Sequence, residues 1–252
     1  MVLFNVSLPA HNQHTHTIIF LHGHESSARD LSQLIWESHD RRGWSLQHIF
    51  PSVKWVFPQA EEVYVERFQQ YLSRWYDIWD ARDPDDRRDL QVPGLRNATP
   101  QLISLIKSEA SRVGLANVIL AGVSQGCATA VHALLNYPIS ETAEEGNRLC
   151  AFIGLSGWMS LQAGSAQESR QLLGAVSTPN DNIYLNTPAF LSHCADDTAV
   201  PIIQGERLRH TLTTYGMTVT WKPYLSGGQW INTPQGVEDL VAFLKTQGLA
   251  SM

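Results

Sequence analysis

The chain has 252 residues, of which 43% are hydrophobic and 17% charged, and its formal net charge is −6 at pH 7. This composition is that of an ordinary globular protein and excludes a disordered chain. The acidic balance argues against nucleic-acid binding. No apolar run approaches the roughly 18 residues that span a bilayer, so we expect no integral membrane protein. Three irregularly spaced cysteines fit neither a zinc site nor a disulfide framework and favour a cytoplasmic protein.

Apolar runs alternate with helical patterns from the start of the chain. Residues 17–22 predict a buried strand, and the spacing of apolar residues over 31–35 predicts a helix. Residues 48–57 have strand character interrupted by Pro51. We expect a helix over 61–71 and a solvated loop over 80–94, where the acidic and basic residues of 80–89 nearly cancel.

The alternation is more regular in the second half. An apolar stripe over 102–110 predicts a helix that ends near Gly114. Strands are predicted at 117–123, 150–155, 188–193 and 217–224, and helices at 125–135, 167–173, 201–215 and 237–244. This order predicts an α/β fold with a mostly parallel central sheet and helices on both faces. We expect a single domain over residues 1–252, with 1–16 as an N-terminal extension or edge strand.

The sharpest motif is Gly122-Val-Ser-Gln-Gly126, which follows an apolar strand and opens a helix. A nucleophile elbow requires this context, with small residues around a serine in a tight turn. Ser124 is then the candidate nucleophile. The backbone N–H groups of Gln125 and of His24, which ends another strand, are the candidate oxyanion donors. The alternatives are an ordinary turn with a capping serine and a glycine turn with exposed histidines.

The segment His193 to Pro201 directly follows a predicted strand and contains Asp196 and Asp197. A carboxylate at the C-terminal end of a strand is where a triad acid lies. Asp197 comes 73 residues after Ser124, in the chain order of α/β-hydrolases. The alternative is an Asp turn before a helix.

Four segments together resemble the phospholipase/carboxylesterase branch of the α/β-hydrolases, which contains the acyl-protein thioesterases and lysophospholipases. They are Gly122–Gly126 against G-F-S-Q-G, Ser73–Ile78, Phe152–Trp158 ending near L-S-G, and His193–Pro201 against H-G-x-x-D-x-x-V-P. The resemblance implies an α/β-hydrolase fold and hydrolysis of a small-molecule or acyl ester or thioester. It makes Asp197 the acid, requires no cofactor, and suggests a homodimer, since family members often pair.

The resemblance also points to residues that could line an acyl pocket. The candidates are Trp75, Leu155, Trp158 and Met159. The alternative is that several of these large apolar side chains belong to the hydrophobic core.

One position departs from the family pattern. The family's catalytic histidine precedes the last helix, and the matching residue here is Gln229 in Gly227-Gly-Gln-Trp230. No histidine occurs after His210. Imidazole can take the serine proton near neutral pH, whereas a glutamine amide has no useful basicity. We therefore expect very low hydrolytic activity.

Three explanations of Gln229 remain open. It is a substitution introduced into a working esterase, or the protein is a natural relative that has lost hydrolysis and binds a ligand or performs non-hydrolytic chemistry, or another histidine acts as the base. His24 is the best candidate for such a base, because its loop borders the serine.

One cysteine and three histidines lie in positions where a functional role is conceivable. Cys127 lies in the first turn of the helix after Ser124, where the pKa of a thiol can be lowered, but we favour the alternative of a packed small residue without a reactive role. His11, His14 and His16 have no carboxylate among them, so we expect an exposed segment and no metal site.

Overall fold

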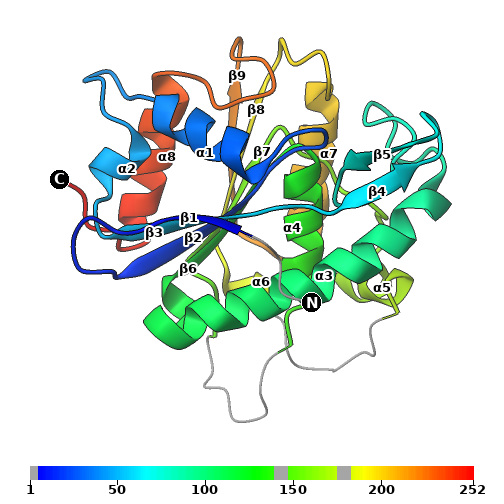
Figure 1. The fold of residues 1–252 in the computed structure, drawn as a ribbon, viewed down its shortest axis with the longest axis horizontal. Coiled ribbons are helices and arrows are strands. Elements are labelled where there is room, and N and C mark those ends of the chain that lie inside the picture. Colours follow the sequence, from blue (N-terminus) through cyan, green and yellow to red (C-terminus); the bar gives the residue numbers. More distant parts are fainter. Residues whose placement is uncertain (1–4, 139–146, 175–182) are drawn as a thin grey trace.

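A seven-stranded sheet forms the centre of the computed structural model, which describes residues 5–138, 147–174 and 183–252 (Figure 1). Its order is β1-β3-β2-β6-β7-β8-β9, and every neighbouring pair is parallel except β1 and β3. The strands are β1 (Asn5–Leu8), β2 (His16–Leu21), β3 (Val53–Pro58), β6 (Val118–Val123), β7 (Ala151–Leu155), β8 (Ala189–Cys194) and β9 (Val219–Tyr224). The predicted, mostly parallel sheet is confirmed, and β1, within the segment 1–16, lies at its edge.

Helices cover both faces of this sheet (Figure 1). One face carries α3 (Arg88–Val113), α4 (Gln125–Leu135), α5 (Ala166–Leu172), α6 (Ile183–Asn186) and α7 (Ile202–Thr214), with the short 3-10 helix η1 (Leu115–Asn117). The other carries α1 (Ala28–Glu37), α2 (Leu46–Ile49) and α8 (Gln235–Thr246). Strand residues alternate between the two apolar cores: Ile19 and Leu120 pack on the first, and Ile18 and Ile119 on the second.

The segment 61–71 is not the helix we predicted. It forms most of a hairpin of β4 (Glu62–Val65) and β5 (Gln70–Ser73). Val65 is buried, while Tyr64 is half-exposed and pairs with Tyr71 across the hairpin at 5.5 Å between ring centroids. This alternation of side chains favours a strand. Our prediction gave too much weight to the helix-forming Glu, Arg and Gln residues.

Two other boundaries differ from prediction. The stretch 48–57 divides into the end of the short helix α2 and strand β3. The expected loop over 80–94 ends early, because α3 begins at Arg88 and includes Pro93. A Cβ on Gly94 would lie 2.5 Å from the Tyr76 Cα, so glycine lets the helix pack directly on that backbone. The predicted end of α3 at Gly114 is confirmed.

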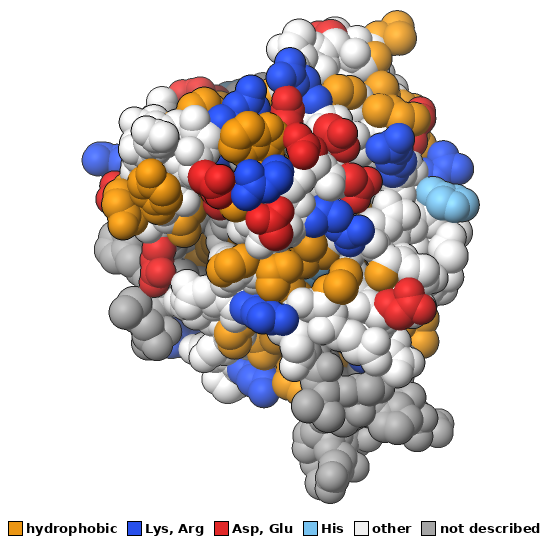
Figure 2. Space-filling model, turned by 90° about the vertical axis from the view of Figure 1, so that its right-hand side faces the viewer, with side chains coloured by type: hydrophobic (Ala, Val, Ile, Leu, Met, Phe, Trp, Pro, Cys, Tyr) orange, Lys and Arg blue, Asp and Glu red, His pale blue; other side chains and the backbone are white. Residues whose placement is uncertain are grey.

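Two features of the surface bear on function. The face shown in Figure 2, which carries the β4–β5 hairpin, has acidic and basic side chains interspersed with apolar ones. Within the three described ranges, no helix combines the length and apolar character needed to cross a bilayer.

Candidate active site

Ser124 occupies a tight turn between β6 and α4. Its backbone has φ 53° and ψ −125°, a conformation that is strained for a residue with a side chain. A Cβ on Gly122 would lie 2.4 Å from the Gly126 backbone, and one on Gly126 would lie 2.4 Å from the carbonyl oxygens of Leu21 and His22. Only glycine fits at both positions. The strand, turn and helix that a nucleophile elbow needs are therefore all present.

The side chain of Gln229 reaches Ser124 from the loop between β9 and α8. Its Nε2 donates a hydrogen bond of 2.9 Å to Ser124 Oγ. Asp196 holds this loop, because its carboxylate accepts hydrogen bonds from the backbone N–H groups of Gly227 and Gly228 at 3.2 and 2.8 Å. The tertiary structure thus brings residue 229 to the serine, 105 residues away in sequence.

Asp197 lies buried beyond the end of β8. Its Oδ1 accepts hydrogen bonds from the N–H groups of Ala199 and Val200, both at 2.9 Å, and its Oδ2 lies 3.3 Å from His193 Nε2. Burial acts to raise the pKa of Asp197, but these neighbours outweigh it and hold the pKa below its ordinary value. The carboxylate is therefore ionised at neutral pH. Within the described ranges it makes no hydrogen bond to Gln229.

The two predicted oxyanion donors lie on either side of Ser124 in the fold. Gln125 is the first residue of α4, so its N–H has no acceptor within the helix. The loop that carries His24 approaches the serine closely, since a Cβ on Gly23 would lie 3.7 Å from Ser124 Oγ. The Gln125 side chain is occupied elsewhere, accepting from the Trp75 N–H and donating to the Tyr76 carbonyl. The oxyanion assignment itself stays a prediction.

The four candidate acyl-binding residues are buried, between 0% and 5% exposed. Trp75 Nε1 donates to the His22 carbonyl at 2.8 Å, and Trp158 Nε1 donates to Ser160 Oγ at 3.0 Å. Leu155 and Met159 pack in the two apolar cores. None of the four lines the charged pocket next to His24 or the pocket between α3 and α5. Their burial favours the core alternative, and the acyl-binding role stays a prediction.

Other histidines near the site have structural partners. His132 is fully buried, and desolvation lowers its pKa to about 4, although its Nε2 lies 2.9 Å from the Ser160 carbonyl. His193 Nε2 lies 2.8 Å from the Val200 carbonyl. Desolvation also lowers the pKa of His24, with Arg74 adding to the effect, so His24 is neutral at pH 7. Its Nδ1 is buried without a partner among the described residues.

Of the two interpretations of Cys127, the packed small residue agrees with the structure and the lowered pKa does not. Burial raises the pKa of this thiol to about 12. Its sulfur fills a space left by two glycines: a Cβ on Gly154 or Gly157 would lie 2.7 or 2.3 Å from it. Cys127 is therefore a buried small residue that packs against both glycines. The described ranges hold no group of three or more side chains that could ligate a metal.

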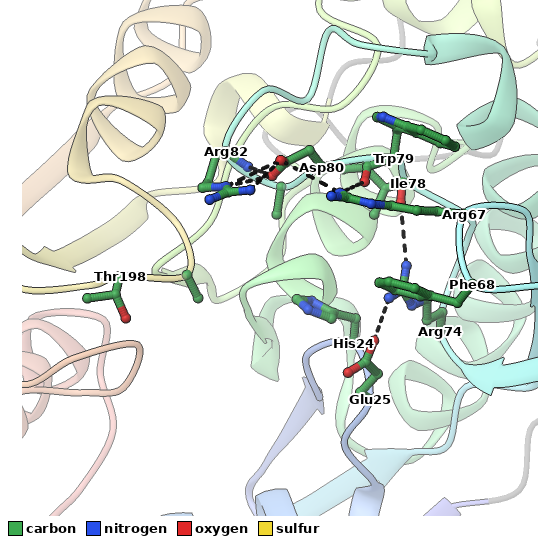
Figure 3. A pocket seen from close by; sticks show the side chains of 12 residues that line it. His24, Glu25, Arg67, Phe68, Arg74, Ile78, Trp79, Asp80, Arg82 and Thr198 are labelled. Carbon is green, nitrogen blue, oxygen red and sulfur yellow. Dashed lines mark hydrogen bonds and ion pairs between the residues drawn. The ribbon is translucent and has the colours of Figure 1, made fainter.

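A charged pocket of about 300 Å³ lies next to the loops that carry Gly23 and Asp197, and no sequence pattern predicted it (Figure 3). Its lining includes His24 and Glu25 from the loop after β2, Thr198 and Ala199 from the loop that carries Asp197, and the arginines 67, 74 and 82. We interpreted the charges of 80–89 as a solvated loop, but Asp80 and Arg82 belong to this wall. The signal in the sequence is Arg74 itself, which lies inside the segment Ser73–Ile78 that resembles the family.

Known proteins resemble the chain over nearly its whole length. Acyl-protein thioesterase 1 of Yarrowia lipolytica is 30% identical over 206 residues, covering 81% of this chain and 79% of that protein. The protein of the same name in Gibberella zeae is 25% identical over 243 residues, covering 95% and 93%. The crystal structure of Zea mays acyl-protein thioesterase 2 superposes with a TM-score of 0.73 at 22% identity, covering 97% and 98%.

These similarities confirm the predicted α/β-hydrolase fold. The family model for Phospholipase/Carboxylesterase matches residues 5–247. The chain therefore belongs to the phospholipase/carboxylesterase family.

Proposed function

We propose that the protein is a serine hydrolase of the carboxylesterase/acyl thioesterase class, which acts on an ester or thioester through Ser124 and Asp197. The observation that carries the proposal is Ser124 in a strained elbow with residue 229 hydrogen-bonded to its Oγ at 2.9 Å. A base at position 229 would stand where it can take the serine proton. The relatives named acyl-protein thioesterase support this class of substrate.

The reaction would proceed in two steps. Ser124 Oγ attacks the substrate carbonyl and loses its proton to the base, while the N–H groups of His24 and Gln125 hold the oxyanion. The bond to the alcohol or thiol breaks, and the leaving group takes the proton. Water then attacks the acyl-enzyme, which releases the carboxylic acid and restores the serine hydroxyl. Ionised Asp197 would orient an imidazole at position 229 and stabilise its cation.

The protein carries a neutral amide, Gln229, at the position where the base is required. Gln229 Nε2 donates to Ser124 Oγ, the opposite of the proton acceptance that a base must perform. This observation favours a second candidate, a ligand-binding or non-hydrolytic member of the family in which Ser124 and its donors hold a carbonyl or carboxylate. The two candidates share the elbow and differ in whether an ester bond is cleaved.

The first experiment compares hydrolysis of 4-nitrophenyl butyrate by the chain as written and by Gln229→His. We expect Gln229→His to raise kcat/KM by several orders of magnitude, because an imidazole at this position supplies the missing base. Ser124→Ala in the Gln229→His background should remove the gain.

Circular dichroism spectra and Tm values serve as the control that all three proteins are equally folded. If folded Gln229→His hydrolyses neither this ester nor the corresponding thioester, the hydrolase proposal is wrong for this chain and the ligand-binding candidate takes its place.

A further inference from the structure

The charged pocket is closed by segments from both sides of the candidate site. His24 and Glu25 follow Gly23, on which an added Cβ would lie 3.4 Å from Ser124 Cβ, and they form one wall. Thr198 and Ala199, next to Asp197, form another. A substrate whose carbonyl lies at Ser124 would therefore extend a neighbouring group into this space. The side chains that line the pocket decide which chemical group of the substrate can bind there.

Charged side chains dominate that lining. Figure 3 shows Arg82, Asp80 and Arg67 along one wall, opposite His24 and Glu25. Three arginines against two carboxylates give the lining one net positive charge. Phe68 and Trp79 are the large aromatic side chains there, and the Arg67 guanidinium lies 5.8 and 5.6 Å from their ring centroids. A long aliphatic chain would have to desolvate these charges, which is costly.

The carboxylates are already engaged by arginines. Both Asp80 oxygens accept hydrogen bonds from Arg82, between 2.7 and 3.3 Å. Arg74 Nη2 donates to Glu25 Oε1 at 2.5 Å. The acceptor capacity that remains in the pocket is therefore small.

More hydrogen-bond donors than acceptors remain available in the pocket. Arg67 makes one hydrogen bond, from Nη1 to the Trp79 carbonyl at 2.7 Å, and its Nη1 lies 3.7 Å from Asp80. Arg74 Nε is buried without a partner in the part of the chain that the structure describes, and so is His24 Nδ1. Buried polar groups in native proteins are normally paired, so these two atoms are donors that a ligand can engage. Among the described residues, Asp77 Oδ1 is an unpaired acceptor near the Arg74 guanidinium, at 3.9 Å from Arg74 Nη1.

We propose that this pocket is a carboxylate subsite, and that the protein takes an ester or thioester bearing a carboxylate group close to the reacting carbonyl. The single net positive charge matches a monoanion such as a carboxylate rather than a dianionic phosphate. The planar guanidinium group of an arginine can donate two parallel hydrogen bonds to a planar carboxylate. The inference rests on the proposed function for cleavage of the ester, but the binding of a carboxylate can be tested without it.

The binding test uses the chain as written, which is not expected to turn over an ester. Isothermal titration compares monomethyl adipate, which carries a carboxylate, with the neutral dimethyl adipate. We expect the monoanion to bind at least tenfold more tightly at low salt, and the difference to shrink at 0.5 M NaCl. Arg67→Gln should remove most of this preference, whereas Arg112→Gln, an exposed arginine at the far end of α3, should retain it.

The turnover test uses Gln229→His with 4-nitrophenyl monoadipate and 4-nitrophenyl hexanoate, which have acyl chains of equal length. We expect kcat/KM at least tenfold higher for the anionic ester, and Arg67→Gln should lower that ratio. A second pair, the butyrate esters of 4-hydroxybenzoate and of its methyl ester, places the carboxylate on the leaving group. Whichever pair shows the preference identifies the side of the scissile bond that faces the pocket.

The outcomes separate the two proposals. Equal or tighter binding of the neutral diester, or a preference of Gln229→His for both neutral substrates, would overturn the carboxylate subsite while the hydrolase proposal stands. Tight binding of monomethyl adipate without cleavage of any ester by Gln229→His would support the subsite and refute the hydrolase proposal.

Discussion

The elbow around Ser124 and the charged wall formed by residues 61–87 border the same site but are held by different forces. At the elbow, Gly122 and Gly126 allow backbone atoms of β2, β6 and α4 to touch, and any added atom collides. In the wall, Arg74 is 4% exposed, but its partner Glu25 is 48% exposed, and Arg82 and Arg87 are largely solvated.

This difference has a consequence for substitutions. Close packing of backbone tolerates no change in volume, because the interior cannot relax without moving a strand. Ion pairs in contact with water are screened and individually weak. The elbow should therefore be rigid and intolerant of mutation, whereas the wall can change its charge pattern, and with it the bound ligand, at small cost to folding.

The largest effect is expected from Gly126→Ala. Its Cβ would lie 2.4 Å from two carbonyl oxygens at the end of β2, so the elbow or the strand must move. We expect a loss on the order of 3 kcal/mol in the free energy of unfolding, or roughly 6–12 °C in Tm. Gly228→Ala is the control: it has open space but φ +61°, and about 1 kcal/mol is expected. Similar losses in both variants would contradict the steric explanation.

A smaller effect is expected from Glu25→Gln, which changes the partner of Arg74 in the wall. The variant leaves the buried Arg74 guanidinium without its carboxylate at 2.5 Å, although Asp77 remains at 3.9 Å. We expect a loss of about 1 kcal/mol, measured by urea unfolding, because Glu25 is half-exposed and the amide can still accept a hydrogen bond. The matched change Glu66→Gln, whose partner Arg87 is exposed, should cost nearly nothing. Equal costs would show that burial of Arg74 has no influence.

The smallest effect is a pH dependence at Asp80. Hydrogen bonds from Arg82 lower the pKa of Asp80 from 3.8 to about 2. Because the folded-state pKa is depressed, this pair contributes stability above about pH 4, and the contribution is lost as the pH falls through 2. The side chain is partly solvated, so less than about 1 kcal/mol is expected. Tm values of the protein and of Asp80→Asn should differ at pH 5 and converge near pH 2; a constant difference would rule out this ion pair as the cause.

Local sequence patterns predicted most of the sheet. The apolar strand at 117–123, the helix at 125–135 and the glycines between them predict an elbow from local spacing and residue type, and the structure contains it. The hairpin at 62–73 escaped prediction because its stability comes from pairing and from the burial of Val65, which helix propensity does not represent. The start of α3 depends in the same way on the contact of Gly94 with Tyr76.

The sequence by itself determined the α/β alternation, the elbow and the absence of a histidine at position 229, since these depend on local spacing and residue type. Only the tertiary structure decided that Gln229 donates to Ser124, that Asp196 holds the glycines of the loop 227–228, and that Cys127 is fully buried. It alone revealed the arginine pocket. The physical reason is that hydrogen bonds, desolvation and net charge in a pocket depend on distances between segments far apart in the chain, and these distances exist only after the sheet has formed.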